Sequence, residues 1–398
     1  MLDGSQRQEN LERVREAERA GRGAFGGLPL RLTVELTADC NLRCPHCEFT
    51  PPRALAEKQG LKPMLHVPLK DLDWLAREVF PHVTEVIPSV VGEPMMYPFW
   101  DQFLAHCAEH GVFVDVVTNG TYLTPERLAR LGPVCSKLRV SMDGASPKTF
   151  NVLRAPSDFD DVVARLRTVA AWRATLAPEK RPTVRIESTV MAQWIDELPA
   201  MVRLAKELRV DGLGVAHVVA YNEHWERSNL RHQPEHADER FREAAAEARR
   251  LNLSLHLPKL FTTGENLSHE APPAFPLHPK VELPAIPADD RPTYCQYLWR
   301  EAFVSIDGDI APCCGLGRPV VGNLRATPDL RAIFADPVLV QMREGTINGD
   351  LHPACAKCPQ LAMFGDVSYD DASFRGTYAA LADHRRKKEE RARKALEG

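Results

Sequence analysis

The sequence predicts an α/β fold, in which a partial (β/α)6 TIM-like barrel is followed by a smaller C-terminal domain. Apolar runs rich in β-branched residues recur six times, and amphipathic helical patterns lie between most of them. Such alternation implies right-handed crossovers and a parallel sheet, and eight units would close a full barrel. The six predicted strands fall in residues 30–37, 83–91, 112–119, 137–143, 183–190 and 212–219.

The predicted helices carry clear start and stop signals. Thr124 is the expected N-cap of one helix, followed by a first-turn proline and a first-turn acid, and Gly132 ends it. Ser146, also followed by proline, is expected to open the next helix in the same way. Segments 195–208 and 238–251 are amphipathic at helical period.

Changes in composition divide the chain into five predicted segments. A proline-rich stretch without periodicity separates the barrel from a second group of cysteines, and a run of basic and acidic residues ends the chain. The segments are an N-terminal helical arm (1–30), the barrel (31–220), a sixth helix and proline-rich linker (221–290), the cysteine-containing domain (291–365) and a charged C-terminal helix (366–398).

Composition excludes several classes of protein. The 398 residues carry a net charge of −4, which gives no general sign of nucleic-acid binding. No apolar run approaches the roughly 20 residues that span a bilayer, and the polar N-terminus is unlike a secretion signal. We therefore expect a cytoplasmic protein with neither a nucleic-acid nor a membrane partner. Ten cysteines would stay reduced there, so close cysteine spacings favour metal or redox chemistry over disulfides.

Three of these cysteines form a compact group directly after the first predicted strand. Cys40, Cys44 and Cys47 follow the pattern C-x3-C-x2-C. Three thiolates can hold a [4Fe–4S] cluster by three of its irons, which leaves the fourth iron open to another ligand. The alternative is a zinc site, for which His46 is the nearest candidate fourth ligand.

Other unusual residues follow the later strands at the same end of the predicted sheet. "GEP" follows the second strand, "TNG" the third, "SMDG" the fourth, and "EST" lies late in the fifth. Parallel α/β barrels place their chemistry at the C-terminal ends of their strands. Each motif alone could simply terminate a strand, but four in register with the cysteines predict a site.

In these motifs the chain resembles the radical S-adenosylmethionine (SAM) enzymes. The signature of that family is C-x3-C-x-aromatic-C, and His46 stands here at the aromatic position, which flanks the adenine. "VGEP" resembles the GGEP segment that receives the amino group of SAM, with Val91 in place of the first glycine. The resemblance covers residues 31 to about 220.

The resemblance implies a set of SAM-binding residues in this chain. Ser141 is the implied carboxylate or ribose contact, Arg154 is implied to lie near the carboxylate, and Ser188 is a further ribose candidate. The complete implied set is His46, Gly92, Glu93, Pro94, Thr118, Asn119, Ser141, Arg154 and Ser188.

The resemblance also implies the reaction. SAM would chelate the open iron of the cluster, and an external donor such as a flavodoxin or a ferredoxin would supply an electron. Reductive cleavage of SAM then gives a 5′-deoxyadenosyl radical, which takes a hydrogen atom from the substrate. The barrel would exclude water and competing hydrogen donors.

The second cysteine group resembles the SPASM/twitch auxiliary-cluster domain. Cys313 fits the spacing of that domain better than its neighbour Cys314, and no cysteine follows the last C-x2-C pair, so one auxiliary [4Fe–4S] cluster is implied instead of two. A zinc ribbon-like site is the alternative. Cys107 and Cys135, outside both groups, are predicted to be small core residues. The implied ligands are Cys295, Cys313, Cys355 and Cys358.

A fully ligated auxiliary cluster has no iron for the substrate, which favours a role in electron transfer. We therefore expect a two-electron oxidation (dehydrogenation) of a small-molecule or peptide substrate, with this cluster as acceptor. The alternatives are radical C–C or C–S bond formation, peptide modification, redox-neutral epimerisation, and a non-catalytic iron–sulfur or zinc-binding protein. The sequence does not identify the substrate; residues that could line its pocket are Asp143, Glu187, His217, Tyr221 and His224.

Overall fold

A computed structural model of the chain provides the structure. It describes residues 5–47, 65–218, 223–271, 295–315, 318–326, 329–356 and 358. Most of the predicted proline-rich linker, the charged C-terminal helix and Tyr221 lie outside the described residues.

The described strands form one ten-stranded sheet in the order β10-β9-β8-β1-β2-β3-β4-β5-β6-β7. Neighbouring strands from β8 through β1 to β7 pair in parallel, and β9 and β10 are antiparallel additions. The strands are β1 (Arg31–Val34), β2 (Glu85–Ile87), β3 (Phe113–Thr118), β4 (Cys135–Ser141), β5 (Thr183–Val190), β6 (Gly212–His217), β7 (Ser254–His256), β8 (Glu301–Val304), β9 (Asp309–Ala311) and β10 (Gly322–Asn323).

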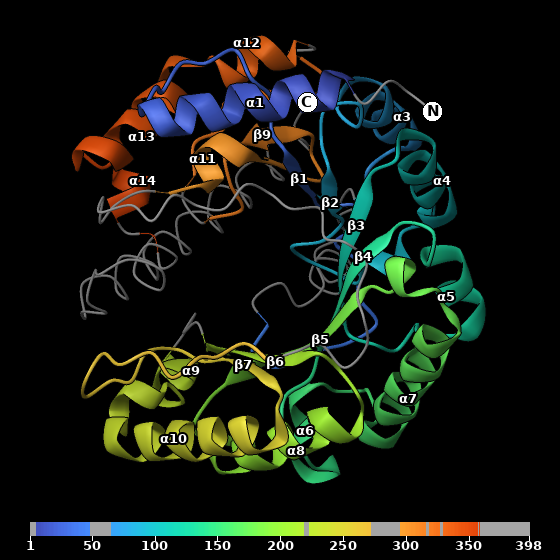
Figure 1. The fold of residues 1–398 in the computed structure, drawn as a ribbon, viewed down its shortest axis with the longest axis vertical. Coiled ribbons are helices and arrows are strands. Elements are labelled where there is room, and N and C mark those ends of the chain that lie inside the picture. Colours follow the sequence, from blue (N-terminus) through green and yellow to red (C-terminus); the bar gives the residue numbers. More distant parts are fainter. Residues whose placement is uncertain are drawn as a thin grey trace, which may run out of the picture.

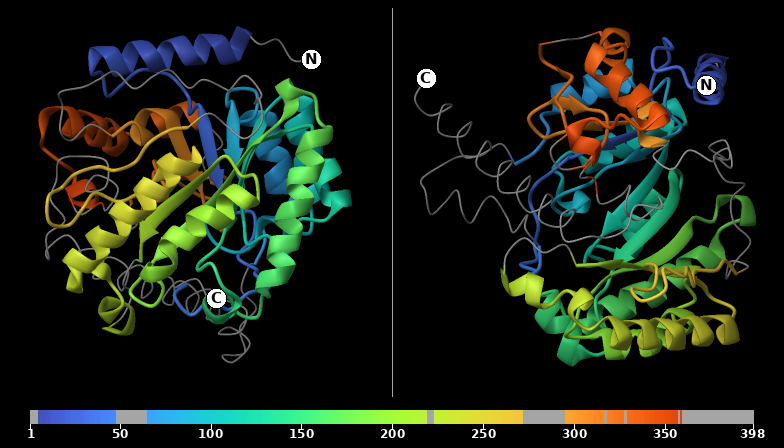
Figure 2. Two further views of the ribbon diagram at one scale, coloured as in Figure 1. Left: turned by 60° about the horizontal axis from the view of Figure 1, so that its bottom comes forward. Right: turned by 90° about the vertical axis from the view of Figure 1, so that its left-hand side faces the viewer.

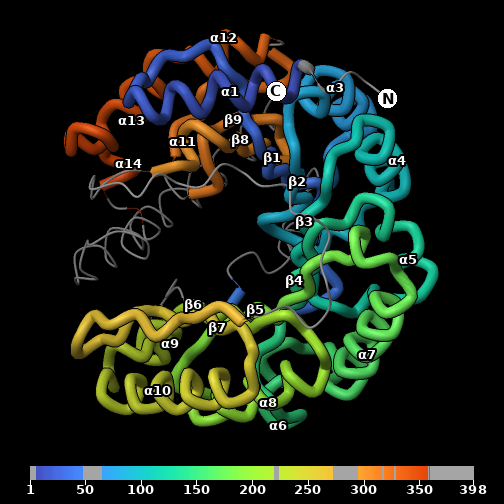
Figure 3. Tube along the Cα trace, in the orientation of Figure 1, coloured from blue at the N-terminus to red at the C-terminus, as the bar shows by residue number. Residues whose placement is uncertain are grey.

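The six predicted strands are confirmed, and the structure extends the sheet at both ends. At one end β7 pairs with β6. At the other, β8 of the C-terminal domain pairs with β1, with Arg31 opposite Glu301 and Val34 opposite Val304. The C-terminal domain is thus continuous with the barrel sheet, and Figure 3 shows its orange trace beside the blue start of the barrel.

Helices cover the outer face of the curved sheet, and the sheet and helices together form an open arc (Figure 1). The helices are α1 (Ser5–Ala20), α3 (Leu69–Glu78), η1 (Pro94–Met96), α4 (Trp100–His110), α5 (Pro125–Leu131), α6 (Pro147–Leu153), α7 (Phe159–Thr175), η2 (Pro178–Lys180), η3 (Ile195–Glu197), α8 (Leu198–Glu207), α9 (Glu223–Arg227), η4 (Leu230–His232), α10 (Pro234–Leu251), α11 (Tyr297–Arg300), α12 (Leu330–Phe334), α13 (Pro337–Asn348) and α14 (Pro353–Ala356). None of the described helices is long and apolar enough to cross a membrane.

The two predicted helix starts have different outcomes. Thr124 is confirmed as an N-cap, since its side chain accepts a hydrogen bond from the Arg127 amide, and Gly132 follows the last residue of α5. Ser146 precedes α6 but makes no side-chain cap bond. Its hydroxyl donates instead to Glu197 at 3.1 Å, and the same carboxylate accepts the Ala145 amide at 2.7 Å. Glu197 thereby ties the loop after β4 to η3.

The N-terminal helix is attached to the C-terminal domain by buried charges. Arg300 donates two hydrogen bonds, of 2.6 and 2.8 Å, to the carboxylate of Glu18 on α1. Arg343 on α13 donates to the carbonyls of Gly23, Leu298 and Phe334. Figure 2 shows α1, in blue, against the orange helices.

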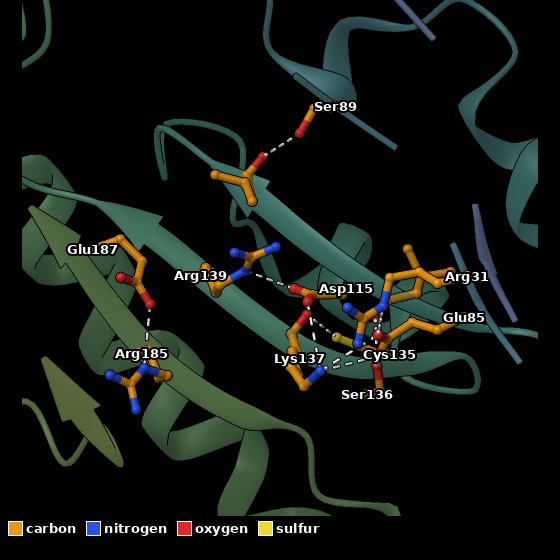
Figure 4. Close-up of polar contacts among 12 residues, drawn as sticks. Arg31, Glu85, Ser89, Asp115, Cys135, Ser136, Lys137, Arg139, Arg185 and Glu187 are labelled. Atoms are coloured by element: carbon orange, nitrogen blue, oxygen red, sulfur yellow. Dashed lines mark hydrogen bonds and ion pairs between the residues drawn. The ribbon is translucent and has the colours of Figure 1, made fainter. Parts of the chain in front are cut away.

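The inner face of the sheet is charged, whereas its outer face is apolar. On β5, Val184, Ile186 and Val190 are buried under helices, while Arg185 and Glu187 alternate with them on the opposite face. Figure 4 shows these two residues with the neighbouring charged side chains of β1 to β4. The ion pairs join Arg31 to Glu85 and Glu301, Lys137 to Glu85 and Asp115, Arg139 to Asp115, and Arg185 to Glu187.

A buried ion pair joins α7 to the start of β6 and yields a stability prediction. Arg173 and Asp211 lie 2.6 Å apart, and both side chains are buried. Truncating one partner of such a pair costs about 3–5 kcal/mol, because the other charge stays buried. We expect Arg173→Ala to lower the free energy of unfolding in urea by that amount. Arg167→Ala on the same helix removes an exposed pair with Glu207, and it should cost less than about 1 kcal/mol. Equal losses in the two variants would contradict the prediction.

Candidate functional site

The first three cysteines lie in the loop that follows β1, at the C-terminal edge of the barrel strands. The amide of Leu42 donates to the Cys40 thiol at 3.4 Å, and the amide of Cys47 donates to the Cys44 carbonyl at 3.0 Å. Burial raises the pKa of the Cys40 and Cys44 thiols, and the charges of Cys44 on Cys40 and of Cys47 on Cys44 act in the same direction. Cys44 therefore lies close to both Cys40 and Cys47.

The segment after β2 packs directly on the backbone that leads into this loop. Gly92 has a φ of +72°, and a Cβ atom there would lie 2.4 Å from the Thr37 carbonyl oxygen and 2.7 Å from that of Asp39. The Glu93 amide donates to the Asp39 carbonyl at 2.7 Å. Only glycine fits this close approach, so Gly92 fixes the position of Glu93 beside the cysteine loop. Pro94 follows as the first residue of η1.

The carboxylate of Glu93 connects the second strand end to the third. It accepts hydrogen bonds from the Thr118 hydroxyl (2.8 Å), the Asn119 amide (2.8 Å) and the Met95 amide (3.3 Å). Glu93 is fully buried, and burial raises its pKa to about 7 against these three hydrogen bonds, which lower it. The structure thus brings Glu93, Thr118 and Asn119 together.

Asn119 links this arrangement to the thiols. Its side-chain amide donates to Asn41 at 2.8 Å and points at the Cys40 sulfur at 3.9 Å. Asn41 in turn donates to the Thr121 hydroxyl at 3.0 Å. The cysteine loop and the ends of β2 and β3 therefore form one hydrogen-bonded unit.

A buried charged group lies on the other side of the cysteine loop. Asp143, at the end of β4, is completely buried, and its carboxylate lies 2.6 Å from Arg154 Nε and 3.2 Å from His46 Nε2. The Thr189 amide donates to the same carboxylate at 2.7 Å. The positive charge of Arg154 acts on the Cys44 thiol, where it lowers the pKa against the larger effect of burial. Asp143 thus contacts both His46, which is part of the cysteine loop, and Arg154, which lies beside that loop.

The two serines in the implied SAM-binding set lie differently. Ser141 ends β4 in register with Glu187, at the edge where the cysteine loop lies. Ser188 points to the opposite face of β5 from Glu187, and its hydroxyl donates to the Met142 carbonyl at 2.5 Å. The structure therefore does not bring Ser188 to the inner face.

The pocket candidates separate in a similar way. Glu187 lies on the inner face, where Gly214 leaves the space that its carboxylate occupies. His217 is half-buried between Phe241 and Phe261, and the loss of solvent around its ring lowers its pKa to about 4. His224 lies on α9 and makes an edge contact with Trp225. Asp143 belongs to the buried charged group, and Glu187 is the described candidate whose contacts place it on the inner face.

The second group of cysteines converges in the C-terminal domain. Every pair among Cys295, Cys313, Cys355 and Cys358 is close enough for mutual electrostatic repulsion. Burial, followed by this repulsion, raises the pKa of the Cys295, Cys313 and Cys355 thiols to about 12. Four thiols in such an arrangement are a donor set for iron or zinc, which bind cysteine as thiolate.

Cys313 and Cys314 are distinguished by their neighbours. The charges of Cys295, Cys355 and Cys358 act together with that of Cys313, whereas the Glu301 carboxylate is the charge with the largest effect on the pKa of Cys314. The assignment of Cys313 as the fourth ligand stays a prediction.

The residues at both positions fit iron–sulfur clusters. No three His, Cys, Asp or Glu side chains in the described ranges converge on a point that a single metal ion could occupy. The thiolates of a four-iron cluster bind different irons, so they need not converge on one point. At the first site, His46 Nδ1 is buried without a hydrogen-bond partner among the described residues, and this leaves a polar atom for a further ligand.

Two family models match the chain. Residues 34–174 match the radical SAM superfamily, and residues 295–359 match the SPASM iron–sulfur cluster-binding domain. The two matched ranges contain the two groups of cysteines described above. They imply a [4Fe–4S] cluster with SAM at the first group and auxiliary iron–sulfur binding at the second.

Curated and solved relatives agree with this organisation. The chain is 28% identical to the AdoMet-dependent heme synthase of Methanosarcina barkeri over 46% of its length, and spans about half (49%) of that relative. It is 28% identical to the PqqA peptide cyclase of Streptomyces rochei over 72% of its length and 70% of the cyclase. Streptococcus suis SuiB bound to S-adenosylmethionine has a similar fold, with a TM-score of 0.57, 18% identity, and coverage of 83% of this chain and 71% of SuiB.

Proposed function

We propose a function for a chain that carries a radical SAM domain at residues 34–174 and a SPASM domain at residues 295–359. The chain is a radical SAM enzyme that removes two hydrogen atoms from a peptide, and an auxiliary iron–sulfur cluster takes up the second electron. One observation carries this proposal: three thiols meet at the barrel edge, and four others meet in the C-terminal domain.

The different numbers of thiols imply different roles. Cys40, Cys44 and Cys47 would hold three irons and leave one for SAM, whereas the four thiols of the second group would occupy every iron of their cluster. When bound, these groups supply a 5′-deoxyadenosyl radical at the first site and an electron acceptor at the second. The chain's own part is to place SAM, to exclude water and to hold the substrate between them.

The residues around the first site would position SAM. Gly92 allows the backbone at Glu93 to meet the cysteine loop, and Glu93 holds the segment of Thr118 and Asn119. We assign the amino group of SAM to the vicinity of Glu93, because a buried carboxylate is a strong acceptor for an ammonium group. Ser141 and His46 Nδ1 are the other polar groups that we assign to SAM.

The proposed reaction balances in atoms and electrons. One substrate hydrogen atom passes to the 5′-deoxyadenosyl radical and forms 5′-deoxyadenosine. The substrate radical then loses one electron to the auxiliary cluster and one proton to a base or to solvent. Dehydrogenation and the closure of a C–C or C–S bond within a peptide have this same balance, so both need an acceptor. Epimerisation needs none.

The class of substrate rests on the relatives. The PqqA peptide cyclase, by its name, acts on a peptide, and the chain matches it over 72% of its length. A non-peptide substrate is the second candidate, because the AdoMet-dependent heme synthase matches 46% of the chain at the same identity of 28%.

A labelling experiment tests the proposed reaction. The reconstituted protein, SAM and dithionite are incubated with candidate peptides deuterated at carbon. We expect deuterium in 5′-deoxyadenosine and a peptide that has lost two hydrogen atoms. Deuterium transfer with a peptide in which one deuterium has been replaced by a hydrogen from solvent, and from which no second hydrogen is lost, would contradict oxidation and indicate epimerisation.

Glu93→Ala is expected to weaken SAM binding without loss of the cluster. A hydrogen bond to a charged group contributes about 1.5–3 kcal/mol, so the dissociation constant should rise roughly tenfold to hundredfold. Equilibrium dialysis with labelled SAM on the iron-loaded variant measures it. Thr118→Val removes one bond to Glu93 but keeps the carboxylate, and it should have the smaller effect. A wild-type dissociation constant in Glu93→Ala would remove Glu93 from the SAM site.

A further inference from the structure

Arg318 lies between the second group of cysteines and the inner face of the barrel. Its guanidinium carbon is 3.8 Å from the centre of the Phe303 ring, and Nη1 donates to the carbonyls of Cys314 and Gly315, both at 2.9 Å. Phe303 lies two residues after Glu301 along β8 and therefore on the same face, and Glu301 pairs with Arg31 on the inner face. The cation is therefore held at the boundary between the barrel interior and the loop of Cys313 and Cys314.

This cation is half-buried and has no carboxylate at ion-pair distance among the described residues. Within the described part of the chain Arg318 forms no ion pair, although the charges of Glu35, Asp309 and the two neighbouring thiols act on it. Removing a charge even partly from water is costly when no opposite charge lies beside it. Cysteine ligands are deprotonated when they hold a metal cluster, so the bound cluster would supply the missing negative charge.

The arginine beside the first group of cysteines has a different environment. Arg154 lies beside Cys44, but its positive charge is offset by the completely buried Asp143 at 2.6 Å. The first cluster thus faces a neutralised pair and the second an unpaired cation. An added electron makes a cluster more negative, and a nearby cation that forms no ion pair stabilises that state.

We propose that Arg318 is an electrostatic positioning residue that raises the reduction potential of the auxiliary cluster and so favours electron flow from the substrate radical to that cluster. The inference rests on the proposed role of the cluster as acceptor. Arg318 acts on the cluster through space and through the loop carbonyls, and Phe303 holds its guanidinium in place.

The test measures the auxiliary cluster alone. In a Cys40→Ala/Cys44→Ala/Cys47→Ala background one cluster remains, and its midpoint potential is found by a redox titration monitored by electron paramagnetic resonance. We expect Arg318→Gln to shift the midpoint to a more negative potential and Arg318→Lys, which keeps the charge, to stay near the parent value. Arg331→Gln, an exposed arginine of the same domain, is the matched control and should have no effect.

Each outcome decides the proposal. An unchanged potential in Arg318→Gln at full iron content would overturn it, as would equal shifts in the Gln and Lys variants. If Arg318→Gln loses the cluster while Arg318→Lys keeps it, the charge is needed to balance the thiolates, which supports the proposal; loss in both would overturn it. The titration uses no substrate, so its result is independent of whether the chain oxidises a peptide.

Discussion

Replacing Cys40, Cys44 and Cys47 together by alanine is expected to abolish SAM cleavage and to remove about half of the bound iron. Two four-iron clusters give about eight irons per chain, and the triple variant should retain about four. The three thiols share one loop, and Cys44 lies close to both of the others, so the first cluster would lose every protein ligand. Iron analysis after anaerobic reconstitution, with chromatography of 5′-deoxyadenosine, measures both effects.

Cys107→Ala is the matched control for this variant. Cys107 is a completely buried cysteine on α4, outside both groups, and burial raises the pKa of its thiol far above the usual value. The Cys107→Ala variant should keep its full iron content and should cleave SAM as the wild type does. Retention of cleavage in the triple variant would remove the first cluster from the reaction, and loss of all iron would show that the two sites do not load independently.

Replacing Cys355 and Cys358 together by alanine is expected to separate SAM cleavage from product formation. The variant should lose the second cluster, because both residues interact with Cys313 and with each other. It should still cleave SAM, since the first site is formed by other elements. Without an acceptor the substrate radical cannot lose its second electron, so the oxidised product should fall to a background level.

The control variant for this prediction also lies in the C-terminal domain, and a folding check accompanies both variants. Cys314→Ala removes the neighbouring thiol outside the proposed ligand set, and it should keep iron and product formation. Because metal binding contributes to folding, each variant is compared with the wild type by circular dichroism. Wild-type product yield from a folded double variant without its second cluster would contradict the acceptor role.

Most of the barrel follows from local sequence. The six predicted strands are runs in which β-branched residues face the helices, and their boundaries agree with the structure to within a few residues, as for β5 at Thr183–Val190. The strand β7 is only three residues long. Such a short run cannot show the alternation of apolar and polar residues that predicts a strand. The pairing of β8 with β1 joins Arg31 to Glu301 across most of the chain, and no local pattern specifies such a distant partner.

The sequence predicts which residues form the site better than it predicts the contacts between them. The spacing of the cysteines and the position of "GEP" indicate the first site because both depend on neighbours along the chain. That Asp143 pairs with Arg154 and His46, and that Ser188 faces the helices, depends on packing between strands. The orientation of Ser188 follows from the sequence, because successive residues of a strand point to opposite faces and Ser188 directly follows Glu187.

Reductive cleavage of SAM by the wild-type chain tests the central claim most directly. The protein is reconstituted with iron and sulfide without oxygen, reduced with dithionite and incubated with SAM, and 5′-deoxyadenosine is quantified. We expect 5′-deoxyadenosine to form only when reductant, SAM and the loaded first site are all present. Wild-type protein that holds its full complement of iron and binds SAM, yet gives no 5′-deoxyadenosine under reduction, would contradict the assignment of this chain as a radical SAM enzyme.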